Sequence, residues 1–216
     1  MKELLDIVLH LDKHLEVITA QYGTTTYAIL WVIVFCETGL VVTPFLPGDS
    51  LLFAAGAVSS LGTLNPVVLA LGLIVCALLG DNVNYQVGKA IGPRVMKGEK
   101  SRLFNKKHLD KTHAFFEKYG GKTIIIARFV PIVRTFAPFV AGAGAMNFRK
   151  FIGFSIAGAV LWVTTLFGAG YLFGGYPIVK KNFSVVVFAI IFISILPGII
   201  EFIKHRRSAH ADEPAK

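Results

Sequence analysis

Three long apolar stretches predict helices that cross a membrane. Residues 66–92, 148–175 and 183–203 are each predominantly apolar. At a helical rise of about 1.5 Å per residue, about 20 such residues are enough to cross a hydrocarbon core of about 30 Å. We therefore predict three spanning helices with these bounds.

Two further apolar stretches, residues 24–62 and 123–147, are each interrupted in the middle. The arms on either side are too short to cross, and irregular backbone is tolerated at membrane depth only where protein or a wet cavity lines it. We therefore predict two re-entrant hairpins, each of which enters the membrane and returns to the same side. The predicted breaks contain residues that oppose a continuous helix, namely Pro44, Pro47 and Gly48 in the first hairpin and Pro131 and Pro138 in the second.

Residues 1–22 show a different pattern, in which apolar residues recur every three or four positions. This spacing predicts an amphipathic helix that lies on the membrane surface or packs on the helical bundle. Charged residues and histidines interrupt any apolar core of a signal peptide, so we do not expect this segment to be cleaved. Residues 23–203 then form a single membrane domain.

Basic residues are concentrated in two polar segments, and they predict the orientation of the chain. The loop of residues 93–122 carries nine Lys or Arg residues, and the tail of residues 204–216 is also basic. Because basic loops stay on the cytoplasmic side, we expect the loop and the C-terminal tail to be cytoplasmic. If residues 123–147 crossed the membrane, the two spanning helices that follow would place the tail outside. The charges therefore favour a re-entrant second hairpin.

Short sequence matches between the two halves indicate an internal repeat. On the predicted orientation, the first spanning helix runs inward and the second outward, so the halves are inverted. Inverted repeats with broken helices are typical of transporters. The predicted fold is an all-α integral membrane protein, an inverted-repeat, transporter-like helical bundle with two opposed re-entrant hairpins. The matches are Ala-Gly-Ala at 55–57 and 141–143 and Tyr-x-x-Gly at 85–88 and 171–174, both displaced by 86 residues, and Phe-x-Pro at 45–47 and 129–131, displaced by 84.

Composition agrees with a membrane protein. Hydrophobic residues make up 54% of the chain and charged residues only 16%, whereas about a quarter of a soluble domain is charged. The net charge of +9 indicates orientation and contacts with anionic lipids, and not nucleic acid, because the basic residues cluster in the loop and the tail. Cys36 and Cys76 lie in apolar segments without the spacing of metal ligands. The sequence therefore predicts no metal site, no disulfide and no cofactor.

Four charged residues lie inside the apolar zone, namely Glu37, Asp49, Arg128 and Arg134. A charge at the centre of a bilayer costs about 2.5–3.5 kcal/mol on insertion scales, so such residues mark a working site by default. The planar guanidinium fork matches phosphate oxygens, and the two arginines are therefore candidate binding residues for an anionic headgroup. Burial disfavours the charged form of a carboxyl group, which makes the two acids candidate proton sites.

A structural alternative applies to the same residues. Arg128 and Arg134 could serve only to neutralise Glu37 and Asp49 as ion pairs. Asp81 is a fifth candidate, as a charge partner or part of a proton relay, but its predicted position near the inner end of its helix agrees equally with a solvated helix end.

Several motifs closely resemble the bacterial DedA family of inner-membrane proteins. The resemblance implies a multi-pass protein of the bacterial inner membrane, with the same core domain as eukaryotic lipid scramblases. It also implies lipid transport, including the return of undecaprenyl phosphate, and activities that depend on the proton motive force. The acidic pair and the arginine pair of the family correspond to the four charges above. The motifs are Phe-Cys-Glu-Thr-Gly at 35–39, Pro-Phe-Leu-Pro-Gly-Asp-Ser-Leu-Leu at 44–52, Gly-Asp at 80–81, and Ala-Arg-Phe-Val-Pro-Ile-Val-Arg-Thr at 127–135.

The leading functional hypothesis is a transporter that moves a phosphate-bearing lipid, undecaprenyl phosphate or a phospholipid, between the leaflets, with protons as the coupling ion if the acids take part. Its partners would be membrane lipids, anionic headgroups and protons. The alternatives are a proton-coupled antiporter of small solutes or drugs and a membrane scaffold without transport. An enzyme is not expected, because no nucleophile with a base and no metal set is visible.

Overall fold

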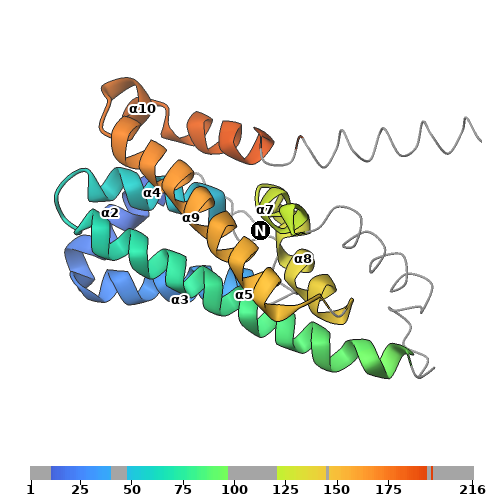
Figure 1. Cartoon of the computed structure of the whole chain (residues 1–216). Helices are drawn as coiled ribbons and strands as arrows, with labels where there is room; N and C mark the ends of the chain where they lie inside the picture. The colour runs from blue at the N-terminus through green and yellow to red at the C-terminus, as the bar shows by residue number, and fades with distance from the viewer. Residues whose placement is uncertain (1–10, 40–47, 97–120, 145, 194–195, 197–216) are drawn as a thin grey trace, which may run out of the picture.

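The computed structural model describes residues 11–39, 48–96, 121–144, 146–193 and 196, and all regular structure in these ranges is helical (Figure 1). The all-helical prediction is confirmed for this part of the chain. The helices are α2 (Leu11–Tyr22), α3 (Thr25–Gly39), α4 (Gly48–Ser59), α5 (Pro66–Met96), α7 (Lys122–Ala127), α8 (Pro131–Ala143), α9 (Phe148–Phe173) and α10 (Pro177–Lys181), and a further helix, Phe183–Ile193, follows α10.

The two longest helices, α5 and α9, correspond to two of the predicted spanning helices. Pro66–Gly92 within α5 and Phe148–Phe173 are long and apolar enough to cross a membrane. However, α5 continues to Met96, four residues beyond its predicted end. The helix passes through Pro93, because a proline removes only one backbone donor and can kink a helix without ending it.

Other predicted segments lie partly outside the described residues. The amphipathic helix predicted for residues 1–22 is described from Leu11 onward as α2, which packs against α4 and α3. The spanning helix predicted for residues 183–203 is described as Phe183–Ile193. Most of the basic loop and all of the basic tail lie outside the described residues.

One face of α5 carries a continuous row of exposed apolar side chains. A row of this kind is expected where a helix faces lipid and is unusual on a soluble protein. The row recurs every four residues and consists of Val67, Leu71, Val75, Leu79, Val83 and Val87.

Helix α3 runs parallel to the first half of α5. At the start of both helices, the backbone N–H of Asn65 donates to the Tyr27 hydroxyl at 2.5 Å. At the end of α3, Gly39 lies so close to Gly80 that a Cβ on Gly39 would be 3.2 Å from the Gly80 Cα. Because α5 extends from residue 66 to 96, α3 ends beside its middle.

Helix α4 runs parallel to the second half of α9. Near its start, Asp49 accepts a hydrogen bond of 2.9 Å from the Trp162 indole, in the middle of α9. Near its end, the Ala57 Cα would lie 2.7 Å from a Cβ on Gly174, which caps α9. The short helix that follows the first interruption thus packs on the long helix of the second half of the chain.

Helices α7 and α8 of the second half are arranged in the same way, but on the opposite long helices: α7 packs on α9, and α8 packs on α5. In α7, the Ile125 Cα would lie 3.4 Å from a Cβ on Gly158, in the first half of α9. In α8, the Thr135 carbonyl accepts a hydrogen bond of 2.6 Å from Asn84, and Ala143 lies beside Gly92. Helix α8 therefore runs parallel to the second half of α5.

Two glycines at corresponding positions allow close contacts between these helices. A Cβ on Gly56 of α4 would overlap the Phe167 carbonyl oxygen of α9, and a Cβ on Gly142 of α8 would overlap the Tyr85 carbonyl oxygen of α5. Gly56 and Gly142 are separated by the 86 residues of the predicted repeat. We call these two contacts, α4 on α9 and α8 on α5, the glycine seams.

Candidate functional site

Charged side chains are buried in the interior, where α3, α4, α5, α8 and α9 meet. They form two groups. The Arg134 cluster consists of Arg134, Glu37 and Asp49, and the Arg128 cluster consists of Arg128 and Asp81 with Ser155. All five of these charged residues were candidates from the sequence, and each is less than one tenth exposed.

In the Arg134 cluster, one guanidinium group binds two carboxylates. Arg134 Nη1 donates to Asp49 Oδ1 at 2.7 Å, and Arg134 Nη2 donates to Glu37 Oε1. Glu37 lies in the last turn of α3 and Asp49 in the first turn of α4, so the two acids approach each other from the two sides of the first interruption. The position of Asp49 at a helix N-terminus also favours its negative charge.

Gly48, a predicted break residue, has a direct role in this cluster. Its backbone N–H donates to Glu37 Oε1 at 3.1 Å, and a Cβ at this position would overlap the Glu37 carboxylate. A glycine is therefore required here for close approach of the backbone, because any larger residue would displace the acid.

Trp162, which the sequence did not single out as a site residue, contacts both clusters. The fully buried indole N–H donates to Asp49 Oδ1 at 2.9 Å. The guanidinium carbon of Arg134 lies 4.6 Å from the centre of the indole ring, and that of Arg128 lies 5.8 Å from it. Both distances are within the range of cation–π attraction.

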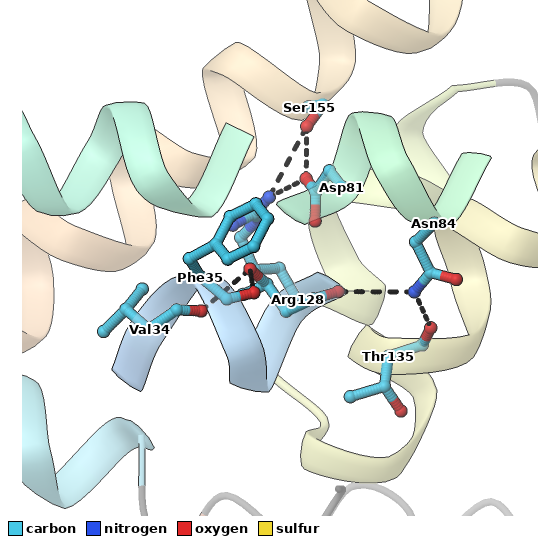
Figure 2. Close-up of polar contacts among 8 residues, drawn as sticks. Val34, Phe35, Asp81, Asn84, Arg128, Thr135 and Ser155 are labelled. Atoms are coloured by element: carbon cyan, nitrogen blue, oxygen red, sulfur yellow. Dashed lines mark hydrogen bonds and ion pairs between the residues drawn. The ribbon is translucent and has the colours of Figure 1, made fainter. Parts of the chain in front are cut away.

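In the Arg128 cluster, Asp81 is the acidic partner (Figure 2). Arg128 Nη2 donates to Asp81 Oδ2, and the Ser155 hydroxyl donates to the same oxygen. Arg128 Nη2 also lies 3.4 Å from Ser155 Oγ. Asp81 is only 1% exposed, so the alternative of a solvated helix end is wrong. α5 continues to Met96, which places Asp81 in the middle of the helix, where Arg128 and Ser155 of α9 contact it.

The ion pairs in the structure differ from the pairs that the sequence analysis considered. Both acids of the first half, Glu37 and Asp49, bind Arg134, and Arg128 binds Asp81 instead. The pairing depends on the position of Arg128 at the C-terminal end of α7, which packs against α9 and α8, and no local pattern in the sequence specifies this packing.

Asn84 is a further buried polar residue of the site, for which sequence reasoning proposed no separate role. Its side-chain amide donates to the Thr135 carbonyl at 2.6 Å and to the Thr38 carbonyl at 3.3 Å (Figure 2). It therefore ties the last turn of α3 and the second turn of α8 to the middle of α5. A polar residue in an apolar stretch was the available signal, but its partners are backbone groups far away in the sequence.

The predicted breaks have different outcomes. Pro44 and Pro47 lie outside the described residues. Pro131 is the first residue of α8, a favourable position for proline, and residues 128–130 separate α7 from α8. Pro138 was wrongly predicted as a break, because it lies inside α8. Only one hydrogen bond within the helix is lost there, and packing on α5 holds the helix together.

Three buried polar atoms of the two clusters have no hydrogen-bond partner among the described residues, namely Glu37 Oε2, Arg128 Nη1 and Arg134 Nε. A buried polar group of this kind is costly unless something binds it. The two arginine atoms could donate to an anion, and the carboxylate oxygen could take a proton. Within the described ranges, no group of three or more His, Cys, Asp or Glu residues is placed to hold a metal ion.

Comparison with known proteins agrees with the motifs. Residues 46–172 match the VTT domain. The chain is 54% identical over 208 residues to protein DedA of Escherichia coli K12, and the match covers 95% of each chain. It is 44% identical over 199 residues to an uncharacterized membrane protein of Mycobacterium tuberculosis (89% of this chain and 87% of the relative). It is 36% identical over 156 residues to the E. coli K12 inner membrane protein YqjA (72% and 70%).

No solved structure matches the chain significantly. The family assignment therefore rests on the sequence matches, which cover nearly the whole chain, and on the two motifs around the buried charges. This chain belongs to the DedA family of VTT-domain membrane proteins.

Proposed function

We propose that this chain is a multi-pass transporter of the bacterial inner membrane that moves a phosphate-bearing lipid, undecaprenyl phosphate or a phospholipid, between the leaflets. The observation that carries the proposal is the pair of arginines buried in an apolar interior, each with an N–H group that has no partner among the described residues. A planar guanidinium group is well matched to phosphate oxygens. The name of YqjA, an inner membrane protein, supports the location.

The proposed architecture is an inverted repeat in which α3 with α4, and α7 with α8, are the two re-entrant hairpins. Three observations support it. Helix α3 ends beside the middle of α5, and α4 and α8 each begin beside the middle of a long helix. The glycine seams use residues that are 86 positions apart. The basic loop and tail would then both be cytoplasmic.

In this mechanism the protein makes and breaks no covalent bond. The headgroup passes the buried arginines while the acyl or prenyl chains stay in the bilayer, and membrane lipids, anionic headgroups and protons are the partners. The lipid chains require an apolar outer surface, and the row of exposed apolar side chains along α5 supports that requirement.

Coupling to protons follows from the number of charges. Among the described residues, three buried carboxylates share two guanidinium groups, which leaves one negative charge unbalanced. A proton on the unpartnered Glu37 Oε2 would restore the balance. A phosphate that binds Arg134 must also compete with Glu37 and Asp49, and protonation of these acids would weaken their hold on the arginine.

The test is reconstitution into liposomes that contain labelled polyprenyl phosphate or labelled phospholipid, with and without a pH gradient. The protein should move at least one of the two lipids faster than protein-free liposomes do. Arg149→Gln is a matched control, because Arg149 is exposed and outside both clusters. Transfer at the protein-free rate for both lipids would contradict the proposed function. If Glu37→Gln and Asp49→Asn both keep full gradient-driven transport, coupling through these acids is wrong.

A further inference from the structure

The two charge clusters lie at different depths along the same face of α9. Ser155, which contacts the Arg128 cluster, and Trp162, which donates to Asp49 in the Arg134 cluster, are seven residues apart on this helix. Seven residues complete almost two turns, so the two side chains lie on one face, separated by about 10 Å along the axis.

Each cluster has one arginine N–H group that no described residue binds. These groups are Nη1 of Arg128 and Nε of Arg134, and both residues are at least nine-tenths buried. Both guanidinium groups also lie against the ring of Trp162, at 5.8 and 4.6 Å. Each cluster therefore has a buried donor without a partner beside the same aromatic ring. These two donors indicate two positions where an anion can bind.

We propose that the Arg128 cluster and the Arg134 cluster are two separate anion-binding sites, which we call stations. Trp162 lines both stations, and the phosphate group passes along its ring from one station to the other. This inference rests on the proposed function and assigns its steps to residues. On the proposed orientation, the Arg128 station is nearer the cytoplasm, because α9 begins there.

The two stations differ in charge. In the Arg128 station, one guanidinium and one carboxylate, Asp81, sum to zero. In the Arg134 station, one guanidinium and two carboxylates, Glu37 and Asp49, sum to one negative charge. Asp81 is a further charged group close enough to act on Arg134, and it is paired with Arg128. A phosphate can therefore enter the Arg128 station without a proton, whereas entry into the Arg134 station requires protonation of Glu37 or Asp49.

Tryptophan fluorescence gives a direct readout, because the chain has only two tryptophans. In protein that carries Trp31→Phe, all tryptophan emission comes from Trp162. This protein, in lipid nanodiscs, is titrated with a C15 polyprenyl monophosphate, and the polyprenol of the same length is the control. The phosphate should produce a saturable change in emission and the alcohol should not.

Charge-matched double variants then separate the stations. Glu37→Gln with Arg134→Gln leaves the Arg128 station intact, and Asp81→Asn with Arg128→Gln leaves the Arg134 station intact. Each pair of changes removes one positive and one negative charge, so neither leaves an additional unbalanced charge in the interior. Each double variant should keep an emission response but lose lipid transfer in liposomes. The response of the Arg134 station should require a lower pH, and that of the Arg128 station should not.

The outcomes distinguish this inference from the proposed function. If the unaltered protein moves lipid phosphate but either double variant loses the emission response entirely, the arginines form one site and the two-station inference is wrong. Lipid transfer without any change in Trp162 emission would also contradict it, as would the same pH dependence in both double variants. If the unaltered protein transfers no lipid at all, the proposed function itself fails.

Discussion

A guanidinium group in an apolar interior needs both its charge and its N–H groups satisfied, and Arg134 and Arg128 meet this need in different ways. Arg134 holds two carboxylates from two helices, whereas Arg128 holds one carboxylate and contacts a hydroxyl. Removal of one member of a buried pair leaves an uncompensated charge, which typically costs about 3–5 kcal/mol. Any test of function at these residues must therefore separate loss of folding from loss of transport.

The observed ion pairs predict which second substitution restores folding after a given first substitution. Arg128→Ala should lower the amount of folded protein in the membrane, and Asp81→Asn should restore it, because the neutral amide no longer needs a counter-charge. Glu37→Gln is the control, since its partner is Arg134, and it should not rescue Arg128→Ala. The measurement is the yield of folded protein together with its thermal unfolding temperature in detergent. Equal rescue by both second changes would contradict the observed pairing.

The shape of the arginine matters if a phosphate binds there. Arg128→Lys and Arg134→Lys keep the positive charge but lose the planar fork, so each should reduce lipid phosphate transfer while most of the protein still folds. A residue that is only a counter-ion would tolerate lysine far better. Arg149→Lys, at an exposed position, is the matched control and should transfer lipid normally. Unimpaired transfer with both buried arginines changed to lysine would exclude recognition by the fork.

At this scale the sequence identified the charged residues but not all of their partners. Glu37, Asp49, Arg128 and Arg134 were recognisable because a charge in an apolar stretch has few explanations. Asp81 was a weaker candidate, and the uncharged members of the site, Asn84, Ser155 and Trp162, carry no comparable signal. Their contacts depend on tertiary packing, which a single sequence does not specify.

At the scale of helices, the glycine seams hold α4 and α8 against the long helix of the other half of the chain. The seams predict a matched pair of effects. Gly56→Ala and Gly142→Ala each place a Cβ on a carbonyl oxygen of the facing helix, so each should destabilise the protein by about 1–3 kcal/mol. Gly168→Ala, on α9, is the control, because a Cβ there meets no atom within 4 Å. Thermal unfolding in detergent measures all three, and a loss of stability in the control alone would contradict the seams.

The sequence predicted these helices better than it predicted their ends. The two long apolar stretches were recognisable from length and composition. The 86-residue offset pointed to Gly56 and Gly142 before their contacts were known. The end of α5 was predicted too early, and Pro138 was misinterpreted as a break, because a proline can kink or end a helix and only the packing around it decides which.

For the whole molecule, the packing of the short helices on the long helices connects the two halves of the chain. Helix α4 packs on α9 and α8 packs on α5, while Asn84 joins α3 and α8 to the middle of α5. A shift of α3 or α8 would therefore act on α5, which both helices contact. The proposed transport needs such a connection, because a central site would then be exposed alternately to the two sides of the membrane.

The last prediction concerns the orientation of the whole chain in the membrane. With Cys36 and Cys76 replaced by serine, single cysteines are introduced at Lys107, Ala209 and Lys180, of which only Lys180 lies within the described residues. An impermeant thiol reagent should label the first two only from the cytoplasmic face, because basic segments stay inside. It should label Lys180, which is exposed on α10, only from the outside. The cysteine-free protein is the control for background labelling. Labelling at Lys180 from the cytoplasm would mean that residues 123–147 cross the membrane, and the re-entrant second hairpin would then be wrong.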